Sequence, residues 1–395
     1  MRNLNQLLAW VLVSISGQLV AQSVPKTMYR LPDTGQIQSF TNTFGEDSDY
    51  SIHTPFFKVN GDGTVTDTVT GLMWQQTDGG EMTFENAQQY CTNLTLATYS
   101  DWRLPSAQEA FSILNHSKPN PALDQNAFTN TGAEYWWTSE KQADNAAKIW
   151  VTNAGGGIGN HPKSETVSAG GSKKMHARAV RDVHSPQSIA KQLVTLDSIV
   201  YDSLTGLEWQ AFLPKDSNTW ENALFFAENL LLEGKNDWRL PNIKELQSIN
   251  DETRFQPSIN PAVFKGAVPG KYWSSTSLPN FPARAWYLDT RYGIVTYTEK
   301  TAKNLILCVR GGNSATTAAA TMEILDKMVF PNPFTSKIQL FPTDPEADYL
   351  LWNVYGQLIF AGKNIAAEDF SYLSSGPYFL TIGGNPMQMI RLIKS

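Results

Sequence analysis

The stretch Val65–Gln75 reads VTDTVTGLMWQ, and it recurs 135 residues later at Val200–Gln210 as VYDSLTGLEWQ. The motif DWRLP stands at Asp101–Pro105 and recurs unchanged at Asp237–Pro241. Solenoid and propeller repeats have periods of roughly 20–50 residues, so a period this long indicates the duplication of a whole domain. The chain of 395 residues is therefore expected to contain a tandem pair of domains and additional segments.

Each copy of the repeat predicts the same series of elements. The alternating residues of VTDTVTGLMWQ, arranged around a Thr-Gly turn, predict paired strands. The segment that begins at Phe84, and its counterpart at Trp220, carries apolar residues at spacings of three and four, which predicts a helix. The residues after each DWRLP predict a second helix, with Ser106 or Asn242 as its N-cap. Together with further short strands, these elements predict an α+β fold for each copy.

The composition excludes several classes of protein. Hydrophobic residues make up 41% of the chain and charged residues only 17%, so the chain is not globally disordered. A net charge of −6 argues against a nucleic-acid partner. Two cysteines and five histidines cannot build a zinc ribbon or a disulfide-dense scaffold. We therefore expect no metal and no other cofactor.

The N-terminal residues 1–22 predict a secretory signal peptide. One Arg precedes an apolar run from Leu7 to Val20, and this run is shorter than the ~20 residues that a membrane-spanning helix needs. No later stretch is long and apolar enough to span a bilayer, so we expect no transmembrane segment in the mature chain. The expected location is secreted or at the outer cell surface after cleavage of the signal peptide.

The repeated motifs resemble those of a known family. TGLMWQ, ENAQQYC, DWRLP, the YWWTS and YWSST segments and the closing CVRGG together are similar to the Lcl C-terminal domain, and they place its two copies at residues 24–183 and 192–312. The resemblance implies a C-type-lectin-like fold for each copy. By analogy it also implies the binding of an extracellular glycan, with sulfated or other anionic glycans as the expected class.

The C-terminal residues 328–395 resemble a different family. FPNPF at Phe330–Phe334, WNVYGQLI at Trp352–Ile359 and the later LSSGPYFLTI are similar to the C-terminal sorting domain of the type IX secretion system. The resemblance implies a small all-β sandwich and the type IX secretion machinery as a partner. The stretch GGNSATTAAAT at Gly311–Thr321 is small and polar, and residues 313–327 are expected to form the linker that precedes this domain.

The repeated aromatic and charged residues are expected to be structural. Eight of the twelve tryptophans fall into four matched pairs, which favours a packing role over a sugar platform. Arg103 and Arg239 stand six residues before Glu109 and Glu245, which predicts an internal ion pair in each copy; the alternative is a charged binding pair. The structural repeat motif comprises Trp74, Asp101, Trp102, Arg103, Trp209, Asp237, Trp238 and Arg239.

The candidate ligand-binding residues belong to the first copy alone. Trp136 stands where the second copy has Tyr272, and we expect it to present a stacking face at the surface. The first copy also carries seven extra residues after Ile158, in a segment rich in basic side chains, Gly and Ser. This segment predicts a mobile basic loop that binds anionic glycans, whereas a solvated loop of no function remains the alternative. Its candidate residues are Lys173, Lys174, His176 and Arg178.

The two cysteines occupy complementary positions of the repeat. In the family that the chain resembles, a helix cysteine and a cysteine of the final strand look like a disulfide within one domain. Here Cys91 aligns with Ala227, and Cys308 aligns with Ala179. Either both thiols are free and buried, or the copies exchange terminal strands so that Cys91 pairs with Cys308.

These observations predict an exported binding or adhesion protein at the cell surface. No catalytic motif such as G-x-S-x-G marks a nucleophile, and we expect no catalytic residues. Two alternatives remain, an extracellular enzyme that acts on polysaccharide and a structural component of a surface layer.

Overall fold

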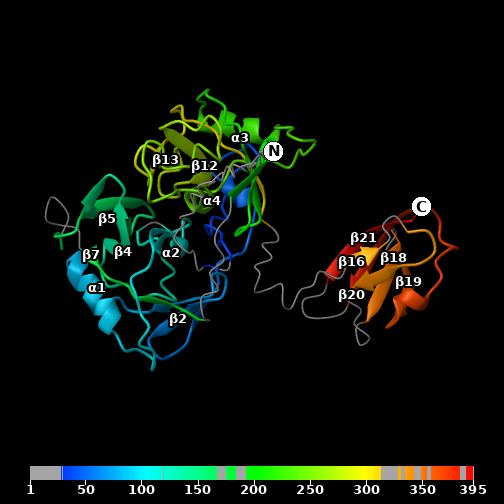
Figure 1. Cartoon of the computed structure of the whole chain (residues 1–395), viewed down its shortest axis with the longest axis horizontal. Coiled ribbons are helices and arrows are strands. Elements are labelled where there is room, and N and C mark those ends of the chain that lie inside the picture. Colours follow the sequence, from blue (N-terminus) through cyan, green and yellow to red (C-terminus); the bar gives the residue numbers. More distant parts are fainter. Residues whose placement is uncertain are drawn as a thin grey trace, which may run out of the picture. The chain divides into compact units, whose positions relative to one another are not determined.

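Figure 1 shows the computed structural model of the chain, which divides into two compact units on either side of residue 315. The structure describes residues 28, 30–118, 120–166, 175–183, 193–312, 328–330, 334–341, 348–353, 357–382 and 388–394. The predicted signal peptide, the predicted linker, Lys173 and Lys174 lie outside these residues. The two units are described separately below.

The two copies of the repeat build matching elements, with four short α-helices among many strands. The first copy contains β1 (Phe57–Val59), β2 (Thr64–Asp67), β3 (Leu72–Gln75), α1 (Phe84–Asn93), α2 (Ala107–Ser112), β4 (Tyr135–Gln142), β5 (Asn145–Asn153), β6 (Ile158–Pro162), β7 (Met175–His176) and β8 (Val180–Asp182). The second contains β9 (Leu193–Leu196), β10 (Ile199–Asp202), β11 (Leu207–Gln210), α3 (Trp220–Glu228), α4 (Ile243–Ser248), β12 (Lys271–Ser277), β13 (Arg284–Asp289), β14 (Ile294–Glu299) and β15 (Val309–Gly311). The described part of both copies is therefore strand-rich and carries two helices per copy, in agreement with the expected α+β class.

The quoted repeat VTDTVTGLMWQ forms the hairpin β2–β3. Val65 pairs with Trp74 in the first copy, and Val200 pairs with Trp209 in the second. The Asp67 carboxylate accepts hydrogen bonds from the next turn, and Gly71 has a φ of 72°, which favours glycine. Each hairpin belongs to a four-stranded sheet, in the order β1-β2-β3-β8 in the first copy and β15-β11-β10-β9 in the second.

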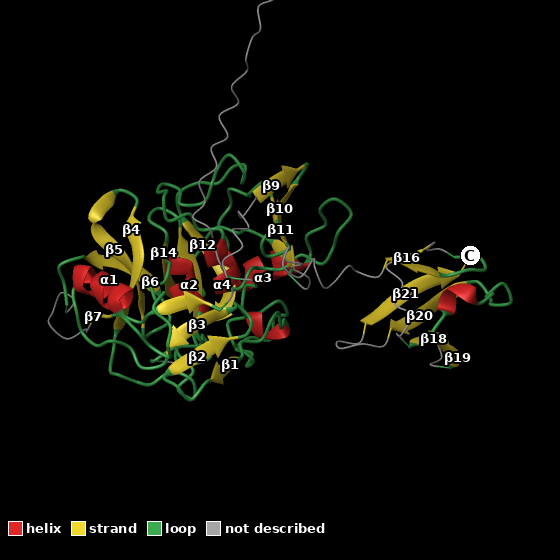
Figure 2. Cartoon of the chain, turned by 60° about the horizontal axis from the view of Figure 1, so that its bottom comes forward, coloured by secondary structure: helices red, strands yellow, loops and turns green. Residues whose placement is uncertain are grey.

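A single seven-stranded sheet joins the two copies. Its strand order is β12-β13-β14-β6-β5-β4-β7, so β14 of the second copy pairs with β6 of the first. Val295 lies opposite Ile158 at this junction. Figure 2 shows α2 and α4 in the same part of the unit as this sheet.

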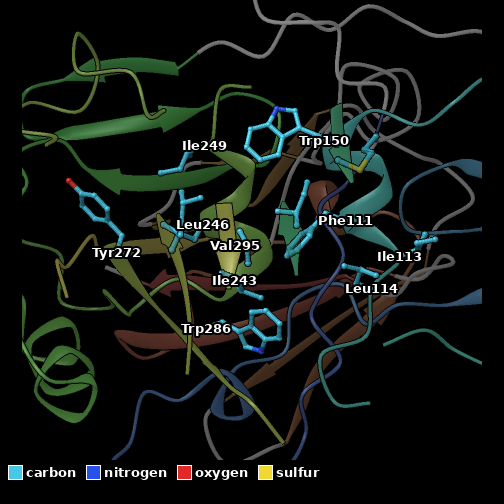
Figure 3. Packing of buried hydrophobic residues seen from close by; sticks show 14 of the residues in the cluster. Phe111, Ile113, Leu114, Trp150, Ile243, Leu246, Ile249, Tyr272, Trp286 and Val295 are labelled. Carbon is cyan, nitrogen blue, oxygen red and sulfur yellow. The ribbon is translucent and has the colours of Figure 1, made fainter. Parts of the chain in front are cut away.

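The core is also shared between the copies. One cluster of buried side chains includes Phe111 and Trp150 of the first copy and Ile243, Trp286 and Val295 of the second (Figure 3). The sequence predicted a tandem pair of domains, and in the structure the two copies pack into one compact unit with a common central core. The physical reason is that each copy turns apolar faces of its second helix and its sheet toward the other copy.

The helices α2 and α4 meet through reciprocal side-chain contacts. Gln108 of α2 donates from Nε2 to the carbonyl oxygens of Gln247 and Ser248, at 2.9 and 3.0 Å. Lys244, at the equivalent position of α4, donates from Nζ to the carbonyl oxygens of Ser112 and Asp33, at 2.7 and 2.8 Å. Gln108 thus adds donors to the C-terminal end of α4, and Lys244 joins the C-terminal end of α2 to the segment before β1.

Both of these short helices begin at the N-caps that the sequence predicted. The side chains of Ser106 and Asn242 each accept a hydrogen bond from the backbone N–H three residues later. The carboxylates of Glu109 and Glu245 accept in turn from the backbone N–H of the cap residue. A helix of six residues is too short to be stable alone, so the caps and the shared core must stabilise it. None of the described helices is long and apolar enough to cross a membrane.

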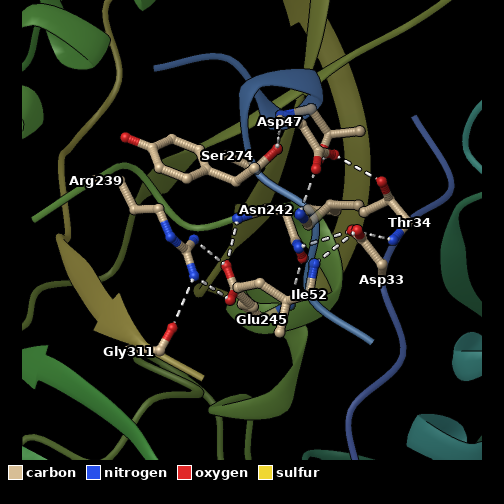
Figure 4. Close-up of polar contacts among 12 residues, drawn as sticks. Asp33, Thr34, Asp47, Ile52, Arg239, Asn242, Glu245, Ser274 and Gly311 are labelled. Carbon is tan, nitrogen blue, oxygen red and sulfur yellow. Dashed lines mark hydrogen bonds and ion pairs between the residues drawn. The ribbon is translucent and has the colours of Figure 1, made fainter. Parts of the chain in front are cut away.

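The segment before β1 packs against the second copy as well as the first, where the backbone N–H of His116 donates to the Thr34 carbonyl oxygen at 2.9 Å. Asp47 accepts from the hydroxyl of Thr276 at 2.6 Å, and Glu46 accepts from the hydroxyl of Ser277 at 2.5 Å. Figure 4 shows how the same segment reaches Asn242 through Asp33. This segment therefore ties the start of the first copy to the body of the second.

The described residues of the C-terminal unit form strands and one turn of 3-10 helix. A four-stranded sheet has the order β19-β18-β20-β21, and β16 pairs with β17. The buried core of the unit includes Phe334, Leu351, Phe370 and Leu380. The elements are β16 (Met328–Phe330), β17 (Gln339–Phe341), β18 (Tyr349–Asn353), β19 (Leu358–Gly362), the 3-10 turn Ile365–Ala367, β20 (Gly376–Ile382) and β21 (Gln388–Lys394).

Replacing Lys244 by Gln, the residue at the equivalent position of the first copy, is expected to keep the fold and remove a pH dependence of stability. Burial lowers the pKa of Lys244 from its ordinary value of 10.5 to about 8, so the folded state binds fewer protons than the unfolded state between these values. From pH 8 to 10.5 the free energy of unfolding of the wild-type protein should rise by up to about 3 kcal/mol relative to that of the variant. Urea unfolding of both proteins measures this difference, and a difference that stays constant with pH contradicts the prediction.

Candidate functional site

The repeated tryptophans are core residues in both copies. All eight are buried, as the sequence predicted, and five of them donate from Nε1 to a backbone carbonyl or lie in aromatic contacts of the core. They therefore offer no platform for a sugar. The eight are Trp74, Trp102, Trp137, Trp150, Trp209, Trp238, Trp273 and Trp286.

The DWRLP motifs form the internal ion pairs that their spacing predicted. Arg103 binds both carboxylate oxygens of Glu109 at 2.7 and 2.8 Å, and Arg239 binds those of Glu245 at 2.6 Å each. The aspartates of the motif contribute as well, because Asp101 accepts from Arg181 and Asp237 accepts from Arg310. Two parallel hydrogen bonds fix both side chains of a pair, so each motif joins a helix start to the closing strand.

Three of the five predicted ligand-binding residues converge on the carboxylate of Asp78. The Asp78 oxygens accept from Trp136 Nε1 at 2.9 Å, from Thr131 Oγ1 at 2.6 Å and from His176 Nδ1 at 2.8 Å, while Arg178 approaches at 3.4 Å. We call Asp78, His176 and Arg178 the buried polar cluster. Its side chains come from the loop after β3, from β7 and from the residues before β8.

The expectation of an exposed basic loop is therefore wrong for the described residues. Trp136 is 6% exposed, and His176 and Arg178 are buried as well. An aromatic ring and a guanidinium that are enclosed in this way cannot stack on or bind a ligand at the surface. Burial is possible because Asp78 neutralises Arg178 and accepts the donors of the others. Lys173 and Lys174 lie outside the described residues.

The electrostatics of the cluster favour its charged form. Burial alone would raise the pKa of Asp78, but the hydrogen bond from His176 and the charge of Arg178 outweigh burial and lower it to about 2. Burial lowers the pKa of Arg178 to about 10, although the charge of Asp78 opposes this shift. The guanidinium also lies 5.0 Å from the ring centre of Phe128. Asp78 and Arg178 therefore both stay ionised at neutral pH.

The buried polar cluster can hold neighbouring groups in place but cannot act on a substrate directly. His176 Nε2 is buried and has no hydrogen-bond partner among the described residues, so a substrate in solvent has no access to the Asp78–His176 pair. Within the described ranges, no three His, Cys, Asp or Glu side chains lie close enough together to hold a metal ion. The cluster fixes the backbone around it, because Arg178 donates to the carbonyl oxygens of Gln75 and Gln76.

A shallow, open groove of about 460 Å³ lies along the outer face of α1, and its lining includes Tyr90, whose ring contacts Gly79. The volume falls within the range of roughly 300–1,000 Å³ of ligand sites. Asn86, Gln89 and Asn93 are exposed on this face, and Tyr90 lies half-buried beside them. Figure 1 shows α1 at the edge of the unit, beside β4 and β7. The full lining comprises Met82, Asn86, Gln89, Tyr90, Asn93, Leu94 and Thr95.

Tyr90 contacts Gln75 and Gly79, which flank Asp78 in the chain. Gln75 donates from Nε2 to the Tyr90 hydroxyl at 2.5 Å. The Tyr90 ring lies directly on Gly79, where a Cβ atom would come within 2.4 Å of the ring carbons. A larger residue at position 79 would displace the ring, so Tyr90 requires this glycine.

The second copy has no equivalent of the buried polar cluster, although Asn86 and Asn93 recur there as the exposed Asn222 and Asn229. The positions of His176 and Arg178 are taken by Leu305 and Leu307, and the spacing of the repeat places Leu213 opposite Asp78. Phe225 of α3 and Leu231 just after it stand at the positions of Gln89 and Thr95 and are 66% and 70% exposed. Sequence reasoning missed Asp78 because TDGGE reads only as a turn. A comparison of which polar residues the copies do not share would have singled it out.

The two cysteines are free and buried, in the cores of different copies. Cys91 packs in a cluster with Ala179, and Cys308 packs in a cluster with Ala227. Each thiol therefore lies near the position that the repeat aligns with the other cysteine. Of the two alternatives from the sequence, the structure shows free thiols. Burial raises the pKa of Cys91 to about 12, which suppresses the reactive thiolate.

Comparison with known families recognises both copies. The sequence model of the Lcl C-terminal domain matches residues 63–181 and, separately, residues 198–310. Each match begins near the first hairpin and ends in the closing strand, so each contains both helices of its copy. No curated protein matches the chain.

Replacing Asp78 by Asn is expected to destabilise the protein by about 3 kcal/mol at pH 7, because Arg178 would stay buried without a counter-charge. The lowered pKa of Asp78 means that its stabilising effect is present above the unfolded value of 3.8 and is lost as the pH falls through about 2. The difference between the two proteins should therefore shrink in acid. Chemical unfolding at pH 7 and near pH 2 measures it.

The exposed Asp216 provides the control, since Asp216→Asn should change the free energy of unfolding by less than about 0.5 kcal/mol at either pH. An equal loss for Asp78→Asn at both values of pH would contradict the ionic role of the cluster.

Proposed function

The chain belongs to the Lcl C-terminal domain family, whose domain it carries twice, and we propose that it is an exported binding protein for an extracellular glycan. In this proposal the ligand lies in the groove along α1 of the first copy. The second copy completes the shared core and presents α4 to α2. The C-type-lectin-like character that the sequence resemblance implies is part of the same proposal.

The lining of the groove is the observation that carries the proposal. Asn and Gln side chains each offer donors and an acceptor, and sugar hydroxyl groups need both. Asn86 and Asn93 lie on the same side of α1 at a spacing of seven residues, about 10 Å along the helix axis. Tyr90 adds an aromatic ring with a polar end between them. A row of amides beside one ring suits a hydroxyl-rich, elongated ligand.

The charge near the groove favours the neutral part of a glycan as its contact. Lys163 and Glu85, at the start of α1, bind each other at 3.0 Å and so offset each other's charge. His176 and Arg178 are enclosed and cannot reach a sulfate or carboxylate group. The binding of an anionic or sulfated glycan would therefore depend on Lys173 and Lys174, the two predicted residues that remain candidates for that role.

Export and delivery belong to the same proposal. The signal peptide predicted at residues 1–22 supports export, and the motifs in residues 328–395 support sorting by the type IX secretion machinery to the outer cell surface. The strands of the C-terminal unit are compatible with a small all-β sorting domain. An enzyme acting on polysaccharide and a surface-layer component are the competing classes, and the experiment below separates them.

Screening the full mature chain on an array of neutral and sulfated glycans is expected to identify a bound glycan. The double substitution Asn86→Ala and Asn93→Ala should then weaken binding at least tenfold, because each amide loses its hydrogen bonds with the ligand. Both side chains are exposed, so the fold should be retained.

The second copy provides a matched control. Asn222→Ala and Asn229→Ala remove the equivalent exposed amides of α3 and should leave binding unchanged. Binding that survives the first pair, or that is lost equally with the second, rejects the groove. Cleavage of the glycan would favour the enzyme, and self-assembly without glycan binding would favour the surface-layer component.

A further inference from the structure

The repeat provides a natural comparison for the buried polar cluster. Trp136 and His176 form a parallel bridge in the first copy, and Tyr272 and Leu305 form the same bridge in the second. Leu305 is therefore the structural equivalent of His176. Leu213 and Leu307, opposite Asp78 and Arg178, are buried with Tyr272 in the shared apolar core. One fold thus accepts charged residues in one copy and leucines in the other.

Energetics argue that the fold does not require the charged version. Burying a carboxylate and a guanidinium carries a desolvation cost of several kcal/mol per ion, and well-packed apolar residues of similar volume are often as stabilising or more so. The second copy realises this apolar solution within the same chain. The charged cluster of the first copy therefore calls for a reason other than folding.

The contacts of the cluster lead to the groove. Arg178 donates from one guanidinium nitrogen to the carbonyl oxygens of Gln75 and Gln76, at 2.8 and 2.6 Å. Asp78 lies between these residues and Gly79, and Gly79 donates from its backbone to Ala177 at 2.8 Å. The cluster therefore fixes both ends of the short stretch 75–79. That stretch carries the two contacts of Tyr90, one from Gln75 to its hydroxyl and one from Gly79 to its ring.

We infer that Asp78, His176 and Arg178 are positioning residues, which hold Tyr90 in the wall of the groove through residues 75–79. This inference rests on the proposed function, since it assigns the cluster to the glycan site. The second copy agrees with it, because the residue at the position of Tyr90 is Phe226, which has no hydroxyl group to orient. The cluster and the tyrosine hydroxyl occur together in the first copy and are both missing from the equivalent positions of the second.

The test transfers the apolar solution of the second copy into the first. The variant Asp78→Leu, His176→Leu and Arg178→Leu, in the full mature chain, should unfold at a temperature no more than a few degrees from that of the wild-type protein. A 3-fluorotyrosine at position 90 should show a shifted or broadened ¹⁹F resonance in the variant, because its supporting loop has lost its fixed geometry. The affinity of the triple variant for the glycan that the wild-type protein binds most tightly on the array should fall at least tenfold.

A second variant keeps the test decisive if the triple variant does not fold. His176→Leu removes the donor to Asp78 and should shift the ¹⁹F resonance and lower the retention, whereas the conservative His176→Asn keeps a donor and should rescue both. An unchanged resonance in a folded triple variant, or a changed resonance with unchanged retention, overturns the positioning role. A shifted ¹⁹F resonance together with lost retention in His176→Asn also overturns it, because the hydrogen bond to Asp78 would then not be what positions Tyr90.

The two proposals fail in different ways. If the wild-type protein retains no glycan of the array, the proposed function fails, while the ¹⁹F resonance still reports whether the cluster positions Tyr90. If the glycan is retained through Asn86 and Asn93 but Tyr90 does not respond to the cluster, only the inference is rejected.

Discussion

The reciprocal contact between α2 and α4 is the interaction on which the repeat unit depends. Each helix is six residues long and cannot persist without tertiary partners. Gln108 and Lys244 supply each helix end with donors from the opposite copy, above a core that both copies fill. The pairing of β6 with β14 continues the same union in the sheet. The two copies therefore form one folded unit, in which both fill the central core and each also keeps a smaller buried cluster of its own.

This union explains how the copies could diverge. Residues at the junction are constrained by both copies, whereas the helices α1 and α3 each pack on the smaller cluster of their own copy. The exposed Asn86 and Asn93 recur as Asn222 and Asn229, whereas Gln89 and Thr95 are replaced by the exposed Phe225 of α3 and Leu231 just after it. The loop beneath α1 likewise carries Asp78, where the second copy continues an apolar core. A site in the first copy alone is consistent with a shared scaffold and separate outer surfaces.

Much of the fold was predictable because its signals are local or repeated at a constant offset. Helix caps such as Ser106, the Arg103–Glu109 pair and the buried tryptophans all follow from short spacings and the need of both copies for the same core. The candidate site was less accessible. Trp136, His176 and Arg178 were selected correctly as features of the first copy, but as an exposed surface. Sequence alone could not show that all three side chains are buried and donate to the carboxylate of Asp78, which is distant in the sequence.

The sequence by itself determined the duplication, the α+β elements of each copy, their caps and their ion pairs, because these depend on residues close together in the chain or on exact repetition. Only the tertiary structure decided that the copies share one sheet and a central core. It also decided that Cys91 and Cys308 are buried in the separate smaller clusters of the two copies, and that Asp78 accepts a hydrogen bond from His176. Those outcomes depend on which apolar faces have no partner within their own copy, and on contacts between residues about a hundred positions apart.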